Sequence, residues 1–490
     1  MQTPQRPHIL LITTDQQRFD TIRSLGNPLI RTPHMDYLVR SGVAFTRGYT
    51  DCPACIPARW TILNGLRAAT YGHPFYRDRD PLAVDPATSL PGLLSDAGYE
   101  TRAVGKMHFW PERARYGFDA MRLPRDYYRY MEKHPHLGRP MRHGIGQNEM
   151  YPCMATVEES NTLTAWTVDE SIDFLETRDP TAPFFLWTSF SKPHPPLDPP
   201  EPYHSMYRGK PVPEPVIGDW TDKCADKTGG IWDDRGHPDD FLARDVRDDA
   251  VRAYYGLITQ IDYNLGRLFA RLFEMGLWDD TLVLLTSDHG EMFGDHHGYG
   301  KSTFFEGSAH VPFVVKPHKG HACWQAGVEP GQRCDAPVML ADILPTVMEA
   351  AGISLLEKGV PTDGEDVLRL CIQPSETRRK YVNGQMSDGT SRHFITDGRY
   401  KLLHHLNGGL TLLFDLAGDP REVCNLAEMP EHAATRVLLD GELRRRLHAV
   451  GHADLDERGE WRDQPAVWVC RNPGAFPGIH STHYDIDVLH

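Results

Sequence analysis

Four apolar runs of strand composition, each followed within a few residues by polar side chains, constrain the fold of this chain more than any other feature. The runs are His8–Thr14, Glu100–Val104, Phe184–Ser189 and Thr281–Ser287. Helical patterns lie between them, most clearly in Asp248–Met275, where apolar residues recur at helical spacing. Apolar strands that alternate with helices predict an α/β fold, with a sheet that helices cover on both faces.

The polar residues that follow these four runs are candidates for a binding site. They are Asp15 and Gln16, Lys106 and His108, His194, and Asp288 and His289. Taken singly, a strand-ending Asp is more often a cap or turn residue than a ligand. In open α/β sheets, however, ligands bind beyond the carboxyl ends of the strands, so these groups should converge. Their shared position therefore predicts one site at one edge of the sheet.

The residue types at this edge favour a divalent cation. Asp15 and Asp288 supply carboxylate oxygens, which suit Ca²⁺, Mg²⁺ or Mn²⁺. Gln16 could add an amide oxygen, and the imidazole of His289 favours Mn²⁺ or Zn²⁺ slightly without excluding Ca²⁺. We expect one cation, with Ca²⁺ first and Mn²⁺ or Mg²⁺ as alternatives.

Cys52 and Cys55 form a Cys-x-x-Cys pair with several interpretations. A redox pair would need a thioredoxin-like context, to which Pro57 and Arg59 do not belong. A zinc site would need two further ligands at paired spacing, and there is no second Cys-x-x-Cys. A buried structural cysteine is the simplest alternative.

Charge and composition exclude several partners. The formal net charge of −15 argues against nucleic acid and anionic membranes, so an anionic small substrate would need a local cluster of cations or a metal. We expect no transmembrane helix, because no run of 18 apolar residues exists. The nine cysteines are irregularly spaced, and no secretory signal is visible, which favours the cytoplasm; a removed signal would imply the periplasm.

A change in pattern near residue 375 predicts a catalytic domain over 1–375 and a C-terminal subdomain over 376–490. His393–Leu406 and Thr411–Asp415 alternate as antiparallel strands, with Asn407–Gly409 as the hairpin turn. A helix follows at about Glu431–Val450. The aromatic tail, with Trp461, Trp468, Phe476 and Tyr484, should pack on the body or on a neighbouring subunit, so the oligomeric state stays open and a homo-oligomer is one of the alternatives.

Other segments frame the site. Val338–Ala351 and Trp60–Leu66 have helical patterns. Residues 110–160 and 195–245, rich in Pro, Gly, His and aromatic residues, should be long excursions around the sheet that set specificity. Within the first, Arg125–Arg142 could contact an anionic or sugar substrate, although an ordinary amphipathic surface is the favoured interpretation.

The segment from Cys55 to Arg59 makes the interpretation specific. Cys55-Ile-Pro57-Ala-Arg59 resembles the Cys-x-Pro-x-Arg signature of type I sulfatases, members of the alkaline phosphatase superfamily. The family's remaining motifs are matched in order by Asp15, Gly105–His108, Lys192–His194, Asp288–Glu291 and Lys301. The later segments Thr396–Lys401 and Leu413–Leu416, with Asp419 and Pro420, resemble its C-terminal subdomain. The resemblance implies a central mixed sheet flanked by helices, with a smaller C-terminal α+β subdomain that carries an antiparallel sheet.

The resemblance also implies roles. A formylglycine-generating enzyme oxidises Cys55 to formylglycine, whose hydrate is the nucleophile. The metal ligands are Asp15, Gln16, Asp288, His289 and residue 55. Arg59 anchors the hydrate, Lys106 and Lys301 bind the ester oxygens, His108 accepts a proton during elimination, and His194 protonates the leaving group. The second hydroxyl of the hydrate releases the intermediate by elimination.

Two positions depart from the best-known lysosomal members, since Gln16 and His289 stand where those have Asp and Asn. Asp-Gln and Asp-His also occur in bacterial and choline sulfatases and in phosphonate or phosphodiester hydrolases of the superfamily. A sulfate monoesterase is therefore the first hypothesis and a phosphonate monoester or phosphodiester hydrolase the second. A non-catalytic anion-binding relative is a third, disfavoured because Cys55 and the metal carboxylates are retained.

Overall fold

The large sheet joins strands from distant parts of the chain. The computed structural model describes residues 6–71, 84–221, 242–372, 379–387 and 391–465. Within these ranges the strands lie in the order β5-β4-β6-β1-β7-β8-β2-β9. Their bounds are Ala120–Arg122 (β5), Glu100–Gly105 (β4), Phe184–Pro193 (β6), His8–Asp15 (β1), Thr281–Ser287 (β7), Phe313–Lys316 (β8), Val43–Phe45 (β2) and Gln332–Cys334 (β9). β8 is antiparallel to β7 and β2 while the other pairs are parallel, so the sheet is mixed, as predicted.

All four predicted strands are present as β1, β4, β6 and β7. β6 is longer than predicted because its pairing with β1 continues to Pro193. Alternate residues of β1 enter different cores: Ile9 and Leu11 pack on one face of the sheet, and Leu10 and Ile12 pack on the other. Burial on both faces explains why β1 and β7, which are buried along their whole length, have nearly continuous apolar sequences.

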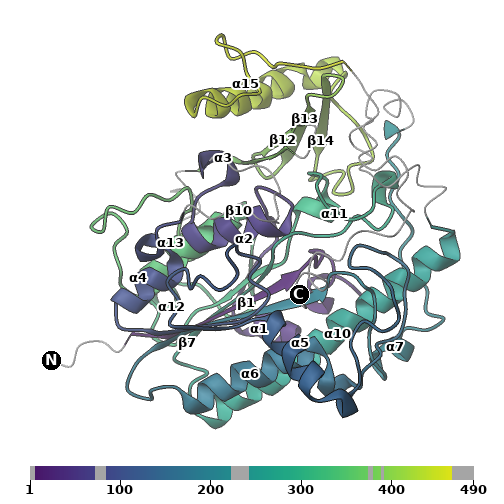
Figure 1. The fold of residues 1–490 in the computed structure, drawn as a ribbon. Helices are drawn as coiled ribbons and strands as arrows, with labels where there is room; N and C mark the ends of the chain where they lie inside the picture. The colour runs from purple at the N-terminus through teal and green to yellow at the C-terminus, as the bar shows by residue number, and fades with distance from the viewer. Residues whose placement is uncertain (1–5, 72–83, 222–241, 373–378, 388–390, 466–490) are drawn as a thin grey trace.

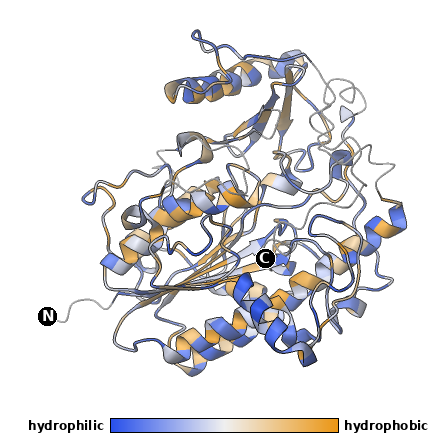
Figure 2. Cartoon of the chain, viewed as in Figure 1, coloured by the Kyte–Doolittle hydropathy of each residue, from blue (hydrophilic) through white to orange (hydrophobic). Residues whose placement is uncertain are grey.

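Helices form a layer on each face of the sheet (Figure 1). α2 (Cys55–Asn64), α4 (Leu90–Asp96), α13 (Ile343–Ala350) and α14 (Val367–Ile372) share the core that contains Ile9. α1 (Pro33–Ser41), α6 (Leu163–Thr177) and α10 (Arg244–Glu274) share the core that contains Leu10. Figure 2 shows α6 and α10 with hydrophilic and hydrophobic residues side by side, as expected for helices between a core and solvent. The other α-helices of the main body in the described ranges are α3 (Ala68–Tyr71), α5 (Pro124–Lys133), α7 (Tyr203–Met206), α11 (Glu306–Ala309) and α12 (Ala322–Gln325).

The helix after Cys55 differs from its predicted bounds. α2 begins at Cys55 instead of Trp60, and it ends at Asn64. Pro57 is accepted within the first turn, where its missing N–H would have no helical partner. Gly65 then ends the helix in a left-handed conformation, with φ 69°. Cys55 is therefore held by regular helical structure, and α2 supplies Arg59 one turn later.

The prediction of a helix over Val338–Ala351 is wrong in its first part. Val338–Met339 is strand β10, which pairs with β3 (Gly48–Tyr49), and α13 begins only at Ile343. The carboxylate of Asp342 accepts the Met339 N–H at 2.8 Å, which favours a tight turn where the pattern had predicted regular helix.

A separate antiparallel sheet lies in the C-terminal part, in the order β11-β12-β13-β14. Its strands are Val382–Ser387, Ser391–Thr396, Tyr400–His405 and Leu410–Asp415. One face packs on the main body through Phe394, Leu403 and Phe414. The opposite face, with Ile395 and Leu402, is covered by α15 (Ala433–Ala449), as Figure 1 shows. The predicted smaller α+β part with an antiparallel sheet is confirmed.

Several details of this region refine the sequence predictions. The predicted strand His393–Leu406 is two strands, because a turn at residues 397–399 separates β12 from β13. Asn407–Gly409 connects β13 to β14 as predicted, and Gly408 and Gly409 both have positive φ. Residue 375 lies outside the described residues, so the domain division there stays a prediction. Trp461 stacks on His404 at 4.2 Å, whereas Trp468, Phe476 and Tyr484 lie outside the described ranges.

In the part of the chain that the structure describes, no helix combines the length and apolar character needed to cross a membrane.

Candidate active site

The four predicted polar positions converge because their strands are neighbours. β4, β6, β1 and β7 are adjacent and parallel, with Gly105 and Thr13 both in register with Ser189, and Thr14 in register with Ser287. Their carboxyl ends therefore meet at one edge of the sheet. Gly105 has φ 89°, and a Cβ there would lie 1.9 Å from the Ser189 carbonyl oxygen, so only glycine fits this approach.

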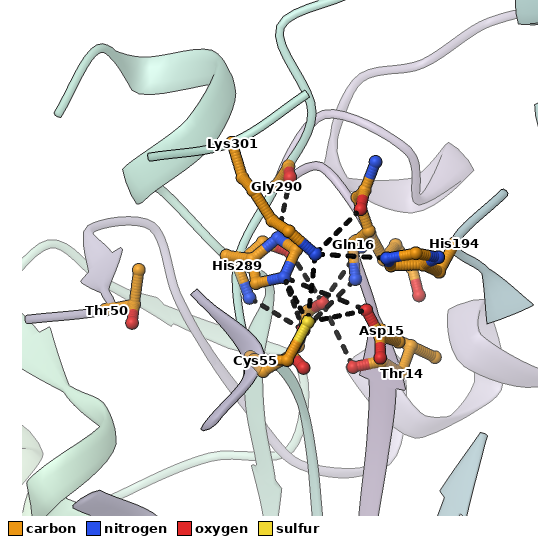
Figure 3. A network of polar contacts seen from close by, with 12 residues as sticks. Thr14, Asp15, Gln16, Thr50, Cys55, His194, His289, Gly290 and Lys301 are labelled. Carbon is orange, nitrogen blue, oxygen red and sulfur yellow. Dashed lines mark hydrogen bonds and ion pairs between the residues drawn. The ribbon is translucent and has the colours of Figure 1, made fainter. Parts of the chain in front are cut away.

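Cys55 lies at the centre of this edge, where α2 begins. Its Sγ is 2.9 Å from Lys301 Nζ, 3.3 Å from His289 Nε2 and 3.7 Å from Asp15 Oδ1 (Figure 3). Lys106 Nζ lies 3.8 Å away on the β4 side. The Cys55 side chain is thus surrounded by groups from four separate segments, all of which had been predicted at this site.

Arg59 fixes the two carboxylates of the site. Its Nε donates to Asp288 Oδ2 at 2.9 Å, and its Nη2 lies 3.5 Å from Asp15 Oδ2. Nη1 donates to Ser189 Oγ at 2.6 Å. All four side chains are fully buried. A guanidinium held by three fixed acceptors orients both carboxylates toward Cys55.

Four of the five predicted metal ligands form a compact set. Asp15, Cys55, Asp288 and His289 each offer one ligand atom, and these atoms lie within 4.8 Å of one another. Burial, and then the neighbouring Asp15, raise the pKa of Asp288, which shows that the two carboxylates repel each other. A divalent cation would relieve this repulsion, so the residues present fit such an ion.

Gln16 has its amide oxygen turned toward Lys301 Nζ, at 3.4 Å, and its amide nitrogen donates to Glu291. Its backbone N–H donates to Asp288 Oδ1 at 3.1 Å. The structure therefore places Gln16 beside the ligand set and in contact with Lys301, and its role as a metal ligand stays a prediction.

Electrostatics favour an ionised residue 55. Burial opposes ionisation, but Lys106, Lys301 and His289 together hold the pKa of the Cys55 thiol well below its ordinary value. A hydrogen bond from His108 contributes in the same direction, which places His108 against Cys55. This cavity therefore stabilises negative charge at its centre, within an acidic protein.

His194 lies beside Lys301 and within hydrogen-bonding reach of Cys55. Lys301 Nζ donates to His194 Nε2 at 3.0 Å, so the other ring nitrogen, Nδ1, carries the proton and donates to the Pro195 carbonyl at 2.9 Å. Burial and then Lys301 lower the pKa of His194 to about 4. Lys106 and His194 also line a pocket with Tyr127 and Tyr128, so part of the Arg125–Arg142 stretch adjoins the site.

Two residues with structural roles at the site were not assigned from the sequence. Glu291 accepts hydrogen bonds from Gln16 and from the Phe293 and Gly300 N–H groups, which fixes the loop that carries Lys301. Its place in the Asp288–Glu291 motif was the available signal. Ser189, the last predicted residue of its strand, gave none, because a serine in a buried strand looks like ordinary core.

Comparisons with known proteins agree with this geometry. A family model described as Sulfatase matches residues 7–353, and one described as N-sulphoglucosamine sulphohydrolase, C-terminal, matches residues 294–449. An arylsulfatase of Clostridium perfringens is 34% identical over 454 residues, which cover 87% of this chain and 91% of the relative.

Other similar proteins are named for different activities. The multifunctional alkaline phosphatase superfamily protein PehA of Trinickia caryophylli is 29% identical, over 95% of this chain and 99% of the relative. The crystal structure of the phosphonate monoester hydrolase of Agrobacterium radiobacter is 28% identical, with a TM-score of 0.75, and the match covers 91% of this chain and 96% of that one.

Proposed function

This chain belongs to the sulfatase family of the alkaline phosphatase superfamily, and we propose that it hydrolyses sulfate monoesters through a formylglycine made from Cys55. The observation that carries the proposal is the position of Cys55. It heads α2 within hydrogen-bonding reach of Lys301 and His289, and beside the Asp15 carboxylate. A formylglycine-generating enzyme would act on this cysteine during maturation.

One divalent cation would be held by Asp15, Asp288 and His289, together with residue 55 and Gln16. We propose Ca²⁺ first, since the acidic oxygens dominate the set, with Mn²⁺ or Mg²⁺ as alternatives. When bound, such a cation would supply Lewis acidity at the site. Arg59 keeps Asp15 and Asp288 in place for this purpose.

The modification would replace a thiol by an aldehyde hydrate, with one hydroxyl to attack sulfur and a second to allow release of sulfate by elimination. Lys106 and Lys301, whose Nζ atoms both lie within 4 Å of the Cys55 Sγ, bind the ester oxygens as point charges. His108 accepts the proton that residue 55 loses during the release.

His194 donates the proton to the leaving oxygen. With Lys301 directed at its Nε2, the imidazole is neutral before substrate binds. A substrate anion would draw Lys301 toward itself and place negative charge beside His194, and both changes raise the pKa of the imidazole. Nε2 can then carry the proton that the leaving group needs. The leaving group would lie in the pocket beside Tyr127 and Tyr128.

Mass spectrometry and kinetics on paired cysteine variants test the proposal. Protein co-expressed with the formylglycine-generating enzyme should carry an aldehyde at residue 55 and hydrolyse an aryl sulfate. Cys55→Ala should be inactive, whereas Cys52→Ser, three residues away and with its Sγ against Met386, should keep both the aldehyde and the activity. Full activity with an unmodified thiol at residue 55 would contradict the proposal.

Hydrolysis of phosphonate monoesters or phosphodiesters is the second candidate. The likeness to PehA and to the phosphonate monoester hydrolase structure supports it. An aryl sulfate and an aryl phosphonate monoester compared side by side on the same matured protein separate the two. A preference of about tenfold or more for the phosphonate, or roughly 1.4 kcal/mol of transition-state stabilisation, would favour this candidate over the first.

A further inference from the structure

A second group of metal-ligating side chains lies in the C-terminal part, away from Cys55. His393, His452 and Asp454 each offer one ligand atom, and these atoms lie within 4.8 Å of one another. His393 Nε2 is 2.8 Å from Asp454 Oδ2, and His452 Nδ1 is 3.6 Å from the same oxygen. The two imidazole rings are nearly perpendicular, with centroids 5.3 Å apart.

The alternation of β12 directs His393 away from the active site. Its neighbour Arg392 donates to the Ser302 carbonyl beside Lys301, on the face that packs on the main body. His393 lies on the opposite face with Ile395, which packs under α15. His452 and Asp454 come from the segment that follows α15. The three residues therefore connect the segment that follows α15 to strand β12.

We propose that His393, His452 and Asp454 bind one Zn²⁺ ion that fastens the segment after α15 to β12. Two imidazoles and one carboxylate suit zinc, whereas Ca²⁺ and Mg²⁺ prefer sites built from oxygen ligands. His393 is fully buried, and its Nε2 is the ring nitrogen that faces the Asp454 carboxylate and would bind the ion. Asp454 and His452 are 16% and 11% exposed, so solvent can reach the ion and supply a fourth ligand.

The hydrogen bonds at this site define what the ion must replace. Asp454 N–H donates to His452 Nδ1 at 3.2 Å, and His393 Nε2 contacts the Asp454 carboxylate. Zinc would bind His452 Nδ1, His393 Nε2 and one Asp454 carboxylate oxygen. It would thus replace these hydrogen bonds while β12 and the segment after α15 stay as they are. Its effect would be on the stability of the C-terminal part, independent of the chemistry at residue 55.

Zinc content of the full-length protein and of matched variants tests the proposal. Protein exposed to Zn²⁺ and freed of loose metal should hold one equivalent more than either His393→Gln or His452→Gln. His452→Gln changes only a partly exposed residue after α15, so it keeps the test valid if His393→Gln fails to fold. His404→Gln is the control, because His404 lies on β13 and pairs with Asp463 at 2.8 Å instead of Asp454. It should retain the zinc.

Thermal unfolding supplies a second readout. Zn²⁺ at about 100 times its dissociation constant should raise the midpoint of thermal unfolding of the native chain. This rise should be about 2–3 °C larger than the rise in His393→Gln or His452→Gln. Turnover of an aryl sulfate by both variants should equal that of the native chain, which separates this site from the catalytic one. Equal zinc content in the native chain and in His452→Gln, or loss of the zinc in His404→Gln, would overturn the proposal.

Discussion

Replacing Lys401 by methionine tests how the C-terminal sheet is attached to the main body. Lys401 is fully buried on β13, and its Nζ lies 2.6 Å from Glu306 Oε1 and 2.9 Å from Glu422 Oε1. Glu306 also pairs with His310 Nδ1 at 2.6 Å. Two carboxylates from separate segments thus share one ammonium group that a third segment supplies.

Methionine fills most of the space of the lysine stem but leaves the two carboxylates without their shared cation. Loss of one partner from a buried ion pair costs about 3–5 kcal/mol. At roughly 2.1 cal/mol/K per residue, the 490 residues have an unfolding entropy of about 1 kcal/mol/K. If the described parts unfold together, Lys401→Met should lower the midpoint of thermal unfolding by about 3–5 °C.

The loss should depend on pH. Burial raises the pKa of Glu422 to about 7 although Lys401 opposes this shift, whereas Lys401 and His310 outweigh burial and lower the pKa of Glu306 to about 2. Without Lys401 both values rise. A carboxyl with a raised pKa in the folded state stabilises the fold below its unfolded pKa, and this contribution disappears as the pH rises through the folded value. The variant should therefore be weakest near pH 8 and closer to the native chain near pH 5.

Scanning calorimetry at both pH values checks this reasoning. The matched control combines Lys401→Met with Glu306→Gln and Glu422→Gln, which removes the charges together and should recover most of the loss at pH 8. A midpoint for Lys401→Met within about 1 °C of the native chain at pH 8 would refute the reasoning. So would a loss of equal size at both pH values.

Three further outcomes follow from the structure. His194→Ala should lower kcat/KM for an alkyl sulfate by about 10²- to 10⁴-fold, because its poor leaving group needs a proton. The loss should be much smaller for an aryl sulfate with an acidic leaving group. An equal loss across a series of leaving groups would argue against His194 as the proton donor. Burial lowers the pKa of His8 to about 4. The neutral His8 ring therefore contributes stability that is present above pH 6.5 and is lost as the pH falls toward 4. His8→Gln should remove this pH dependence from the free energy of unfolding, a change of up to about 3 kcal/mol at about 1.4 kcal/mol per pKa unit. Parallel plots of unfolding free energy against pH for the two proteins would contradict it. Dialysis against a chelator should abolish turnover, and Ca²⁺ or Mn²⁺ should restore it, whereas undiminished turnover in the chelated protein would argue against a catalytic cation.

The predicted site and its geometry agree because the site depends on strand ends. Asp15, Lys106, His194 and Asp288 each follow an apolar run, and such runs identify strands without any knowledge of their neighbours. Cys55 was identified through Pro57 and Arg59, whose spacing places the guanidinium one helical turn away. These features are local, so the sequence was sufficient to predict them.

The two errors in the predicted elements have different origins. The pattern of Val338–Ala351 is helical throughout, but pairing with β3 and the Asp342 hydrogen bond convert its first residues to strand and turn. Here a contact with a distant strand overrode the local preference. The stretch His393–Leu406 contains Asp397-Gly398, a local turn signal that the prediction of one continuous strand did not use, and the Asp397 carboxylate accepts the Arg399 and Tyr400 N–H groups.

The sequence by itself determined which residues are candidates for the chemistry, because motif order and strand composition are contained in short segments. Only the tertiary structure decided which of them touch: Lys301 lies between Cys55 and His194, and Gln16 faces Lys301 and Glu291. It also revealed the His393, His452 and Asp454 group. Such contacts join residues tens to hundreds of positions apart, and no local pattern encodes the strand order that brings them together.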